Sequence, residues 1–431
     1  MRAVAIVLFA WMVCCASIQP SLAADSAKFT EKVLYSFCNK RNCKDGAYPE
    51  APVIAVNGIL YGTTYGGGRG VACYYPGCGT VFSLDPSMGV ETVLHSFCRQ
   101  LFCPDGAFPF DVDLIDVKGT LYGTTFEGGD NACGYNNIGC GIVFSLNPGT
   151  GAENTVYAFC SQSKYNCTDG QYPQGDMVHV RGTIYGTTQG GGSEGMGTVF
   201  ALDTKTGAET VLYSFCASGY PCTDGFNPTG LIVVNGTLYG TTLQGGVYKC
   251  DQGEDCGTAY SLDPNTGVHT VLHSFGSSTD GWYANGLIAL NGILYGTTNG
   301  GETTGCGGFG CGIVFSIDPS TGAETVLYSF CSQQNCTDGA NPFGGLIEVK
   351  GMLYGTTSTG GSTGCGGSGC GTVFSIDPST GSEAVPYSFS GAPSDGQSPD
   401  GVTNVNGTFY GTTEAGGAYG DGTVFVLTKT R

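Results

Sequence analysis

The tetrapeptide Tyr-Gly-Thr-Thr occurs seven times along the chain, and this repetition limits the possible folds more than any other feature. Successive copies are 61, 63, 54, 56, 59 and 56 residues apart and begin at Tyr61, Tyr122, Tyr185, Tyr239, Tyr295, Tyr354 and Tyr410. Such a period is typical of repeat architectures, in which each copy is one supersecondary unit. The sequence therefore predicts seven similar units.

Each unit contains four short runs rich in β-branched and aromatic residues, which predict strands. An Asn-Gly or similar pair separates the first two runs, and an Asp-Pro-x-Thr-Gly turn separates the last two, so both pairs are expected to form hairpins. In the fourth unit the runs are residues 231–234, 237–242, 257–264 and 269–275. No stretch has the apolar periodicity of a helix that competes with this pattern.

The two ends of the chain distinguish a closed ring from an open solenoid. Residues 31–37 match the fourth run of a unit but have no partner runs before them, and residues 422–431 match a third run with no fourth run after it. Seven complete units result only when the two ends join. We therefore predict an all-β protein, a seven-bladed β-propeller with four antiparallel strands per blade over residues 25–431, closed by the N-terminal strand joining the last blade.

Residues 1–24 have the pattern of a secretory signal peptide, with Arg2, an apolar run over residues 3–18, and small residues at the cleavage spacing. The apolar run is shorter than the roughly 20 residues that a membrane span needs. We expect an exported monomer with no membrane span after signal removal and no C-terminal sorting tail. Its expected location is secreted, periplasmic or in the cell envelope.

Acidic residues outnumber basic residues by 35 to 16, which gives a formal net charge of −19 at pH 7. This excess argues against nucleic acid and against anionic membranes as partners. It is compatible with solubility or with cation binding.

The expected mature part keeps 20 of the 22 cysteines, an even number that favours disulfides in an exported protein. Five predicted pairs lie between blades: Cys38/Cys43, Cys98/Cys103, Cys160/Cys167, Cys216/Cys222 and Cys331/Cys336. Five lie within blades, before the third strand: Cys73/Cys78, Cys133/Cys140, Cys250/Cys256, Cys306/Cys311 and Cys365/Cys370. Loops that lack one cysteine lack both, as local pairing predicts. All these loops are expected on one face of the ring, which we call the cysteine face, and the expected role of the disulfides is to stiffen it.

The run Leu-Tyr-Gly-Thr-Thr, followed by Gly-Gly and by Gly-Thr-Val-Phe with Asp-Pro and Thr-Gly, resembles the GloVer tandem repeats of exported bacterial proteins. The resemblance covers nearly all of residues 31–428. It implies a secreted or surface-attached repeat protein, often with a separate C-terminal anchor. It implies no biochemical activity.

Every loop between blades also carries an Asp-Gly pair. The seven aspartates are Asp45, Asp105, Asp169, Asp224, Asp280, Asp338 and Asp395. Such a ring of carboxylates is a candidate site for Ca²⁺, the one cofactor considered. The alternative is that each aspartate accepts backbone N–H groups in its own turn while the glycine adopts a positive φ. This structural role is favoured because all seven blades share the pair.

Function is expected where the repeats disagree, mainly just after Tyr-Gly-Thr-Thr and in the cysteine-bearing loops. The candidate ligand-binding residues are Tyr65, Arg69, Tyr74, Tyr75, Glu127, Gln189, Gln244, Trp282, Tyr283, Asn299 and Glu414. Polar groups beside aromatic rings suit a sugar or a peptide. Drift of solvated loop residues is the alternative explanation.

The leading hypothesis is a non-catalytic module that binds an extracellular carbohydrate or protein ligand. It predicts an exposed aromatic cluster around Tyr74, Tyr75 and Trp282. A purely structural envelope protein is a further alternative.

A secreted lyase or hydrolase is the enzymatic alternative, acting through carboxylates such as Asp116, Glu127 and Glu414 at the channel mouth. It predicts that unrepeated acids, or His179 in a first strand, converge within about 5–9 Å of one another. No catalytic residue is identified by motif.

Overall fold

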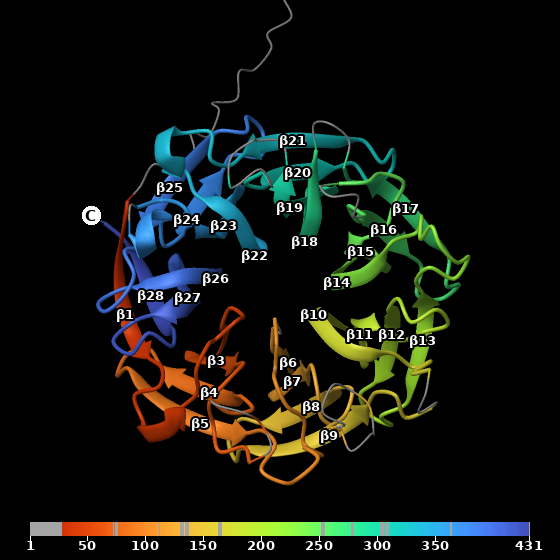
Figure 1. The fold of residues 1–431 in the computed structure, drawn as a ribbon, viewed down its shortest axis with the longest axis horizontal. Coiled ribbons are helices and arrows are strands. Elements are labelled where there is room, and N and C mark those ends of the chain that lie inside the picture. Colours follow the sequence, from red (N-terminus) through yellow and green to blue (C-terminus); the bar gives the residue numbers. More distant parts are fainter. Residues whose placement is uncertain are drawn as a thin grey trace, which may run out of the picture.

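The computed structural model describes residues 28–430 apart from 72, 74–75, 112, 130–132, 134–137, 163–165, 251–254, 277–279, 302–305, 307–309 and 363. The predicted signal peptide lies outside the described residues. The described chain forms seven sheets of four strands arranged in a ring around a central channel (Figure 1). This confirms the prediction of an all-β, seven-bladed propeller.

The strands follow the predicted order from the inside of each blade to the outside. Blades 1 and 2 are β2 (Ile54–Val56), β3 (Ile59–Thr64), β4 (Thr80–Asp85), β5 (Val90–Ser96) and β6 (Ile115–Val117), β7 (Thr120–Thr125), β8 (Ile142–Asn147), β9 (Ala152–Ala158). Blades 3 and 4 are β10 (Gln171–Val180), β11 (Thr183–Gly190), β12 (Thr198–Asp203), β13 (Glu209–Ser214) and β14 (Phe226–Val234), β15 (Thr237–Gln244), β16 (Thr258–Leu262), β17 (His269–Ser274). Blades 5 and 6 are β18 (Gly281–Leu290), β19 (Ile293–Gly301), β20 (Ile313–Ile317), β21 (Glu324–Ser329) and β22 (Ala340–Val349), β23 (Met352–Thr359), β24 (Thr372–Ile376), β25 (Glu383–Ser388). Blade 7 is β26 (Gly396–Val405), β27 (Thr408–Gly416), β28 (Thr423–Lys429) and β1 (Phe29–Ser36).

The ring closes as the unmatched ends of the sequence predict. Strand β1 pairs antiparallel with β28, and the register places Phe29 opposite Lys429 (Figure 1). The first described strand is therefore the outer strand of the last blade. This closure leaves no blade with an unpaired third strand.

Aromatic side chains at equivalent positions join each blade to the next. Phe97, after β5, packs edge-to-face on Phe144 of β8 with ring centroids 5.3 Å apart, and the other six junctions have the same contact. The ring of Phe144 lies against Gly123, where an added Cβ would stand 2.5 Å from the ring. This close approach explains why each Tyr-Gly-Thr-Thr has a glycine.

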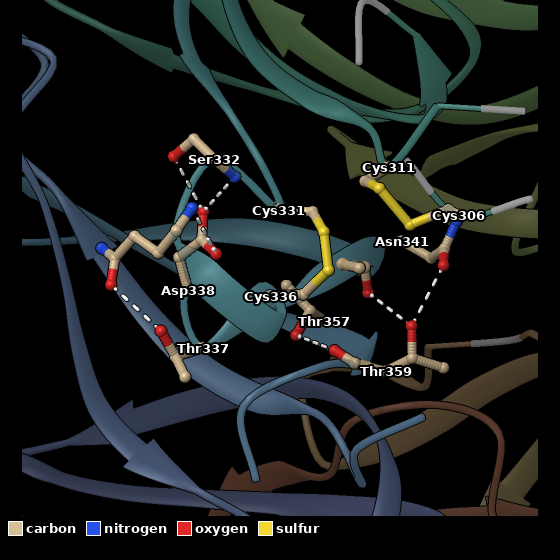
Figure 2. The surroundings of a disulfide bond; sticks show 12 residues. Cys306, Cys311, Cys331, Ser332, Cys336, Thr337, Asp338, Asn341, Thr357 and Thr359 are labelled. Atoms are coloured by element: carbon tan, nitrogen blue, oxygen red, sulfur yellow. Dashed lines mark hydrogen bonds between the residues drawn. A yellow bond between two sulfur atoms is a disulfide. The ribbon is translucent and has the colours of Figure 1, made fainter. Parts of the chain in front are cut away.

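The loops between second and third strands and the loops between blades share the cysteine face. Each of the ten predicted cysteine pairs is a disulfide in the structure. Neighbouring disulfides also meet: the four sulfur atoms of Cys306, Cys311, Cys331 and Cys336 lie within 4.8 Å of one another (Figure 2). Because these sulfurs are bonded in pairs, they are not thiolate ligands for a metal.

Nine of the ten disulfides have at least one buried cysteine, so these residues contribute to the core as well as to the cysteine face. Within blades the second cysteine of each pair is fully buried: Cys78, Cys140, Cys256, Cys311 and Cys370. Between blades the buried cysteines are Cys43, Cys98, Cys103, Cys160, Cys167, Cys216 and Cys222, of which Cys167 is 5% and Cys222 2% exposed. Only the pair of Cys331 and Cys336 has both members half-buried.

The buried cysteines pack against the phenylalanines that join the blades. Cys78 belongs to the same core cluster as Phe97, and Cys167 to that of Phe159. Cys256 and Cys370 lie likewise in the clusters of Phe275 and Phe389. These cysteines are therefore also core residues that fill the junctions between blades, and they are not available to a ligand.

The helices of the described residues are short 3₁₀ turns in the loops of the cysteine face. They are η1 (Arg41–Cys43), η4 (Gln334–Cys336) and η5 (Cys365–Gly367). Within the described part of the chain, therefore, no helix has the length and apolar character needed to cross a bilayer.

Candidate functional site

The seven Asp-Gly aspartates lie apart from one another, each at its own junction between blades. Each accepts a hydrogen bond from a tyrosine or histidine of the preceding fourth strand, at 2.7–3.0 Å, as in the pair of Tyr328 and Asp338 at 2.8 Å. Asp338 also accepts the backbone N–H of Ser332 at 2.9 Å (Figure 2). We call this contact the outer clamp. Its geometry favours the structural alternative for these residues.

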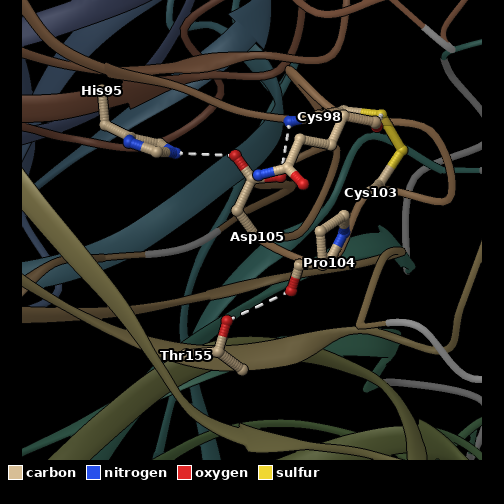
Figure 3. Close-up of polar contacts among 7 residues, drawn as sticks. His95, Cys98, Cys103, Pro104, Asp105 and Thr155 are labelled. Atoms are coloured by element: carbon tan, nitrogen blue, oxygen red, sulfur yellow. Dashed lines mark hydrogen bonds and ion pairs between the residues drawn. A yellow bond between two sulfur atoms is a disulfide. The ribbon is translucent and has the colours of Figure 1, made fainter.

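Two of the four histidines belong to the outer clamp. His95 lies 3.0 Å from Asp105 (Figure 3), and His273 lies 2.9 Å from Asp280. They occupy the position that tyrosine takes in the other five blades. These histidines therefore hold loops and are remote from the channel.

Acidic side chains on the fourth strands lie next to the outer clamp and have raised pKa values. Burial, followed by the charge of Asp169, raises the pKa of Glu209 to about 7. Burial and the charge of Asp338 act likewise on Glu383, whose pKa is also raised to about 7. In blade 4 the same position holds His269, whose ring stacks on Tyr213 and whose pKa burial lowers to about 4.

The central channel contains a cavity of about 190 Å³ to which six blades contribute residues. Its walls come from the segments that enter the innermost strands and from the ends of two second strands. The polar and aromatic lining residues are Phe110, Asp111, Asp113, Gln174, Asp176, Thr229, Asn285, Asn299 and Phe343. Because the innermost strands start on the cysteine face, the cavity lies toward that face of the channel.

One position of the repeat accounts for most of the differences in this lining. It follows the proline that stands three residues after each Asp-Gly, or Ala284 in blade 5. Its seven occupants are Glu50, Phe110, Gln174, Thr229, Asn285, Phe343 and Asp400. Five of these occupants, Phe110, Gln174, Thr229, Asn285 and Phe343, line the cavity, so one structural position presents amides, a hydroxyl and aromatic rings to it.

Carboxylates gather on the side of the channel formed by blades 7, 1, 2 and 3. We call Glu50, Asp111, Asp113, Asp176 and Asp400 the acid half of the channel. Burial, then the charges of Glu414 and Asp111, raises the pKa of Glu50 to about 8. Burial and then the charge of Asp176 raise the pKa of Asp111 to about 7. The acid half is therefore partly protonated at neutral pH.

Asp113 and Asp176 form the closest pair within the acid half. Their carboxyl groups are hydrogen-bonded to each other, and burial raises the pKa of both. One proton shared between the two oxygens removes the repulsion of two buried negative charges.

Two oxygens of the acid half have no hydrogen-bond partner among the described residues. They are Oδ2 of Asp400 and Oε2 of Glu50. Asp400 is only 4% exposed, and its pKa is raised first by burial and then by the charge of Glu414. Oxygens of fourth-strand acids such as Glu209 and Glu383 share this property, so what sets Asp400 and Glu50 apart is their place beside Asp111 of the cavity.

Aromatic rings form an arc beside the acid half. Tyr65 stacks on Phe108 with centroids 5.1 Å apart, Phe110 lies 5.9 Å from both Tyr65 and Phe126, and Phe126 stacks on Tyr172 at 4.7 Å. We call these five rings the aromatic arc. Phe108 and Tyr172 are held at φ values of 56° and 58°, a left-handed conformation that is uncommon for aromatic residues.

Some of the predicted binding residues lie at this mouth. Asn299 lines the cavity, and Tyr65 belongs to the aromatic arc. The charges of Glu414 and Glu127 reach the site, since Glu414 raises the pKa of Glu50 and Glu127 raises that of Tyr65 after burial and Glu50. Tyr65, Glu127 and Glu414 therefore lie near Glu50 of the acid half, whereas Asn299 reaches the cavity from blade 5.

Other predicted binding residues lie elsewhere or outside the described chain. Trp282 is half-buried and packs against the core between blades. Arg69 is exposed on the cysteine face, and Gln189, Gln244 and Tyr283 lie in blade strands away from the cavity lining. Tyr74 and Tyr75 fall outside the described residues.

The first-strand residues considered for catalysis have a structural role at the opposite end of the blades. Asp116 accepts the backbone N–H of Gly119 at 2.8 Å, and His179 accepts that of Gly182 at 3.0 Å. Both side chains cap the hairpin between the first two strands. They do not contribute to the acid half.

The acid half is not among the residues predicted from the sequence, which emphasised the ends of the second strands. A signal for it was present: the residue after the repeated proline differs among blades while its neighbours repeat. The convergence of Asp113 and Asp176 carries no such signal, because they lie 63 residues apart (176 − 113).

A solved structure supports the architecture. Over 94% of this chain and 97% of the other, the chain is similar to an oligogalacturonate lyase in complex with manganese, at a TM-score of 0.52 and 12% identity. At this identity the likeness shows the fold alone. The chain is also similar to the computationally designed Ika8 protein, at a TM-score of 0.49 and 13% identity over 92% of this chain and 99% of the other. No curated protein matches the sequence significantly.

The sequence profile of one repeat family also matches. The profile of the Gloeobacter/Verrucomicrobia repeat covers residues 136–368, from blade 2 into blade 6. This span is more than half of the chain, and it agrees with the resemblance found in the repeated motifs.

Proposed function

Because this chain belongs to the Gloeobacter/Verrucomicrobia repeat family, most of its residues serve a repeated scaffold, and we propose that its function lies where the blades differ. The proposed function is non-catalytic binding of an extracellular carbohydrate at the cysteine-face mouth of the channel. Ten disulfides are compatible with an exported protein.

The observation that carries this proposal is one cavity lined by the carboxyl groups of Asp111, Asp113 and Asp176 together with the ring of Phe110, with Glu50 and Asp400 close enough to affect or be affected by Asp111. Carboxylate oxygens accept strong hydrogen bonds from hydroxyl groups, as Asp400 and Glu50 are free to do. Aromatic faces such as that of Phe110 pack against the apolar face of a sugar ring. A cavity of about 190 Å³ admits a group the size of a single sugar unit and excludes a folded protein segment.

The negative charge of the acid half limits the classes of sugar that the site can bind. Negatively charged sugars are repelled by the acid half, whereas neutral or amine-bearing sugars are not. A glycan array probed with the oxidised mature protein, followed by calorimetry on the strongest glycan, tests this. We expect neutral or amino sugars to bind, and Phe110→Ala or Asp176→Asn to weaken binding by about tenfold or more.

Matched substitutions outside the mouth serve as controls. Asp318→Asn removes an exposed hairpin carboxylate, and Tyr419→Ala removes an exposed ring of the cysteine face, so neither is expected to change binding. Unchanged affinity in the Phe110 and Asp176 variants, or selective binding of uronic acids, contradicts the proposal.

An enzyme remains the second candidate, favoured by the hydrogen-bonded pair of Asp113 and Asp176 with raised pKa values. A protonated carboxyl beside a second carboxyl in a cavity is the arrangement used for general acid–base catalysis. Mass spectrometry of the bound glycan after long incubation distinguishes the two. Intact glycan supports binding, and cleavage that disappears in Asp113→Asn supports the enzyme.

A further inference from the structure

Large apolar side chains are exposed on the cysteine face where blades 1 and 2 meet. Leu101 is 70% exposed, Phe102 is 64% exposed and Val71 is 62% exposed. The backbone N–H of Val71 donates to the carbonyl of Cys98 at 2.9 Å, which joins the loop of Val71 to the loop of the other two. The three side chains therefore belong to one surface region.

The loop that carries Leu101 and Phe102 cannot fold back to bury them. The Cys98–Cys103 disulfide closes it, and Asp105 accepts the backbone N–H of Cys98 at 3.1 Å (Figure 3). Thr155 of β9 donates to the carbonyl of Pro104 just after it, at 3.1 Å (Figure 3). The apolar tip is thus presented on a rigid support.

Comparison with equivalent loops shows that the apolar tip is not required by the fold. The loops 38–43 and 331–336 have the same cysteine spacing, and each places an asparagine, Asn42 or Asn335, at the position of Phe102. All three residues have a left-handed φ, between 59° and 68°. Asparagine tolerates this conformation better than phenylalanine. Phe102 is therefore unfavourable for the local backbone, and it gains no burial in return.

Basic residues lie on the loops of this region, with Arg69 two residues from Val71 and Arg99 two residues from Leu101, although the protein is acidic overall. Five of the 16 lysines and arginines are exposed here: Lys40, Arg41, Lys44, Arg69 and Arg99. Four of them line a hollow of about 570 Å³, and Lys44 and Arg69 also line an adjoining one of about 360 Å³. Among the described residues, only Lys40 of these five has an ion-pair partner, Glu91 at 2.8 Å.

We infer that this basic-apolar edge, consisting of the five basic residues with Val71, Leu101 and Phe102, docks on an anionic lipid surface. Lysine and arginine side chains attract anionic headgroups. Leu101 and Phe102 insert at the boundary between headgroups and acyl chains. Binding to a lipid surface depends on both the basic and the apolar residues, whereas binding to a soluble polyanion depends only on the basic residues.

The overall charge of the protein determines which part of its surface faces the bilayer. With a net charge of −19, most of its surface is repelled by an anionic bilayer. The basic-apolar edge is therefore the part that approaches, and contact is peripheral rather than membrane-spanning.

Co-sedimentation of the mature oxidised protein with vesicles tests this inference. We expect binding to mixed phosphatidylcholine and phosphatidylglycerol vesicles, weaker binding as salt rises, and at least about tenfold weaker binding to pure phosphatidylcholine. The double variant Leu101→Gln/Phe102→Asn gives this tip the residues of Gln334 and Asn335, so its fold has a precedent in the chain itself. We expect it to bind at least about tenfold more weakly, as we expect of Arg69→Gln/Arg99→Gln.

Two controls use exposed residues elsewhere. Val268→Ser changes an apolar side chain of similar exposure, 62%, on the hairpin face, and Lys205→Gln changes a basic residue there. Neither is expected to alter vesicle binding. Equal binding to both kinds of vesicle, no binding to either, or preference for soluble heparin that is insensitive to the Leu101 and Phe102 changes overturns the inference.

Discussion

The two halves of the channel differ in what their polar groups contact. On one side, Asn285 donates to Thr297 and to the carbonyl of Pro342, both at 3.0 Å, and Thr229 contacts Thr241 at 2.6 Å. We call Thr229, Asn285 and Phe343 the neutral half. In the acid half, by contrast, Asp400 and Glu50 each keep an oxygen without a partner among the described residues.

This difference separates two uses of one repeat position. In the neutral half, the side chains of Asn285 and Thr229 are satisfied by hydrogen bonds, that of Asn285 reaching the next blade and that of Thr229 staying within its own, and they contribute to stability. In the acid half, buried carboxylates oppose one another and reduce stability, which is common at sites selected for binding rather than folding. Removing a polar side chain is therefore expected to lower stability in the neutral half and to raise stability while weakening ligand binding in the acid half.

The largest expected effect is on the neutral half. Asn285→Ala removes two hydrogen bonds, one of which reaches blade 6, and leaves the buried carbonyl of Pro342 with fewer donors. We expect a loss of about 2–3 kcal/mol in the free energy of unfolding, measured by denaturant titration. A loss below about 0.5 kcal/mol in the free energy of unfolding would contradict a stabilising role for the hydrogen bonds of Asn285.

A smaller effect of opposite sign is expected in the acid half. Asp400→Asn replaces a buried carboxyl, whose pKa is raised well above its usual value, by a neutral group of similar size. At pH 8 this is expected to stabilise the fold by about 1–2 kcal/mol, because the unfolded chain no longer gains from ionising at this residue. The same variant is expected to bind glycan more weakly. Destabilisation at pH 8 contradicts the description of the acid half as strained.

The smallest effect concerns pH. The folded-state pKa values, about 8 for Glu50 and about 7 for Asp111, lie above those of the unfolded chain. The contribution of these two groups to the free energy of unfolding is therefore complete below about pH 4 and is lost as pH rises toward 8. Glu209 and Glu383 change in the same direction, whereas His269, with a lowered pKa, favours stability above about pH 6.5.

Thermal melting at pH 5 and pH 8 measures this dependence. We expect a lower Tm at pH 8, and we expect Glu50→Gln to reduce the difference by about 1 °C or more. Glu348→Gln, at a hairpin turn of the opposite end, is the matched control and is expected to keep the wild-type difference. A Tm that rises from pH 5 to pH 8 in the wild type is incompatible with the raised pKa values.

The sequence predicted the fold and the loop pairing well because both depend on local, repeated signals. The Asn-Gly turns and alternating runs specify each hairpin, and the unmatched strand at residues 31–37 specifies the closure. Cysteines five to seven residues apart can pair only within their own loop or with a close neighbour. Their burial, as at Cys78 beside Phe97, depends on how neighbouring blades pack, which spacing does not show. Of the predicted binding residues, Asn299 lines the cavity while Trp282 is half-buried against the core, because their positions depend on how the blades pack.

The sequence by itself determined a seven-bladed ring, its cysteine face, and the structural role of every residue that repeats seven times. Only the tertiary structure decided where the exceptions meet. Net charge is a sum over the chain, so it concealed both the acid half, where Asp113 meets Asp176, and the basic-apolar edge, where Arg69 and Arg99 line one hollow. The physical reason is that ring closure brings together side chains from different repeats, and electrostatic energy depends on those distances rather than on composition.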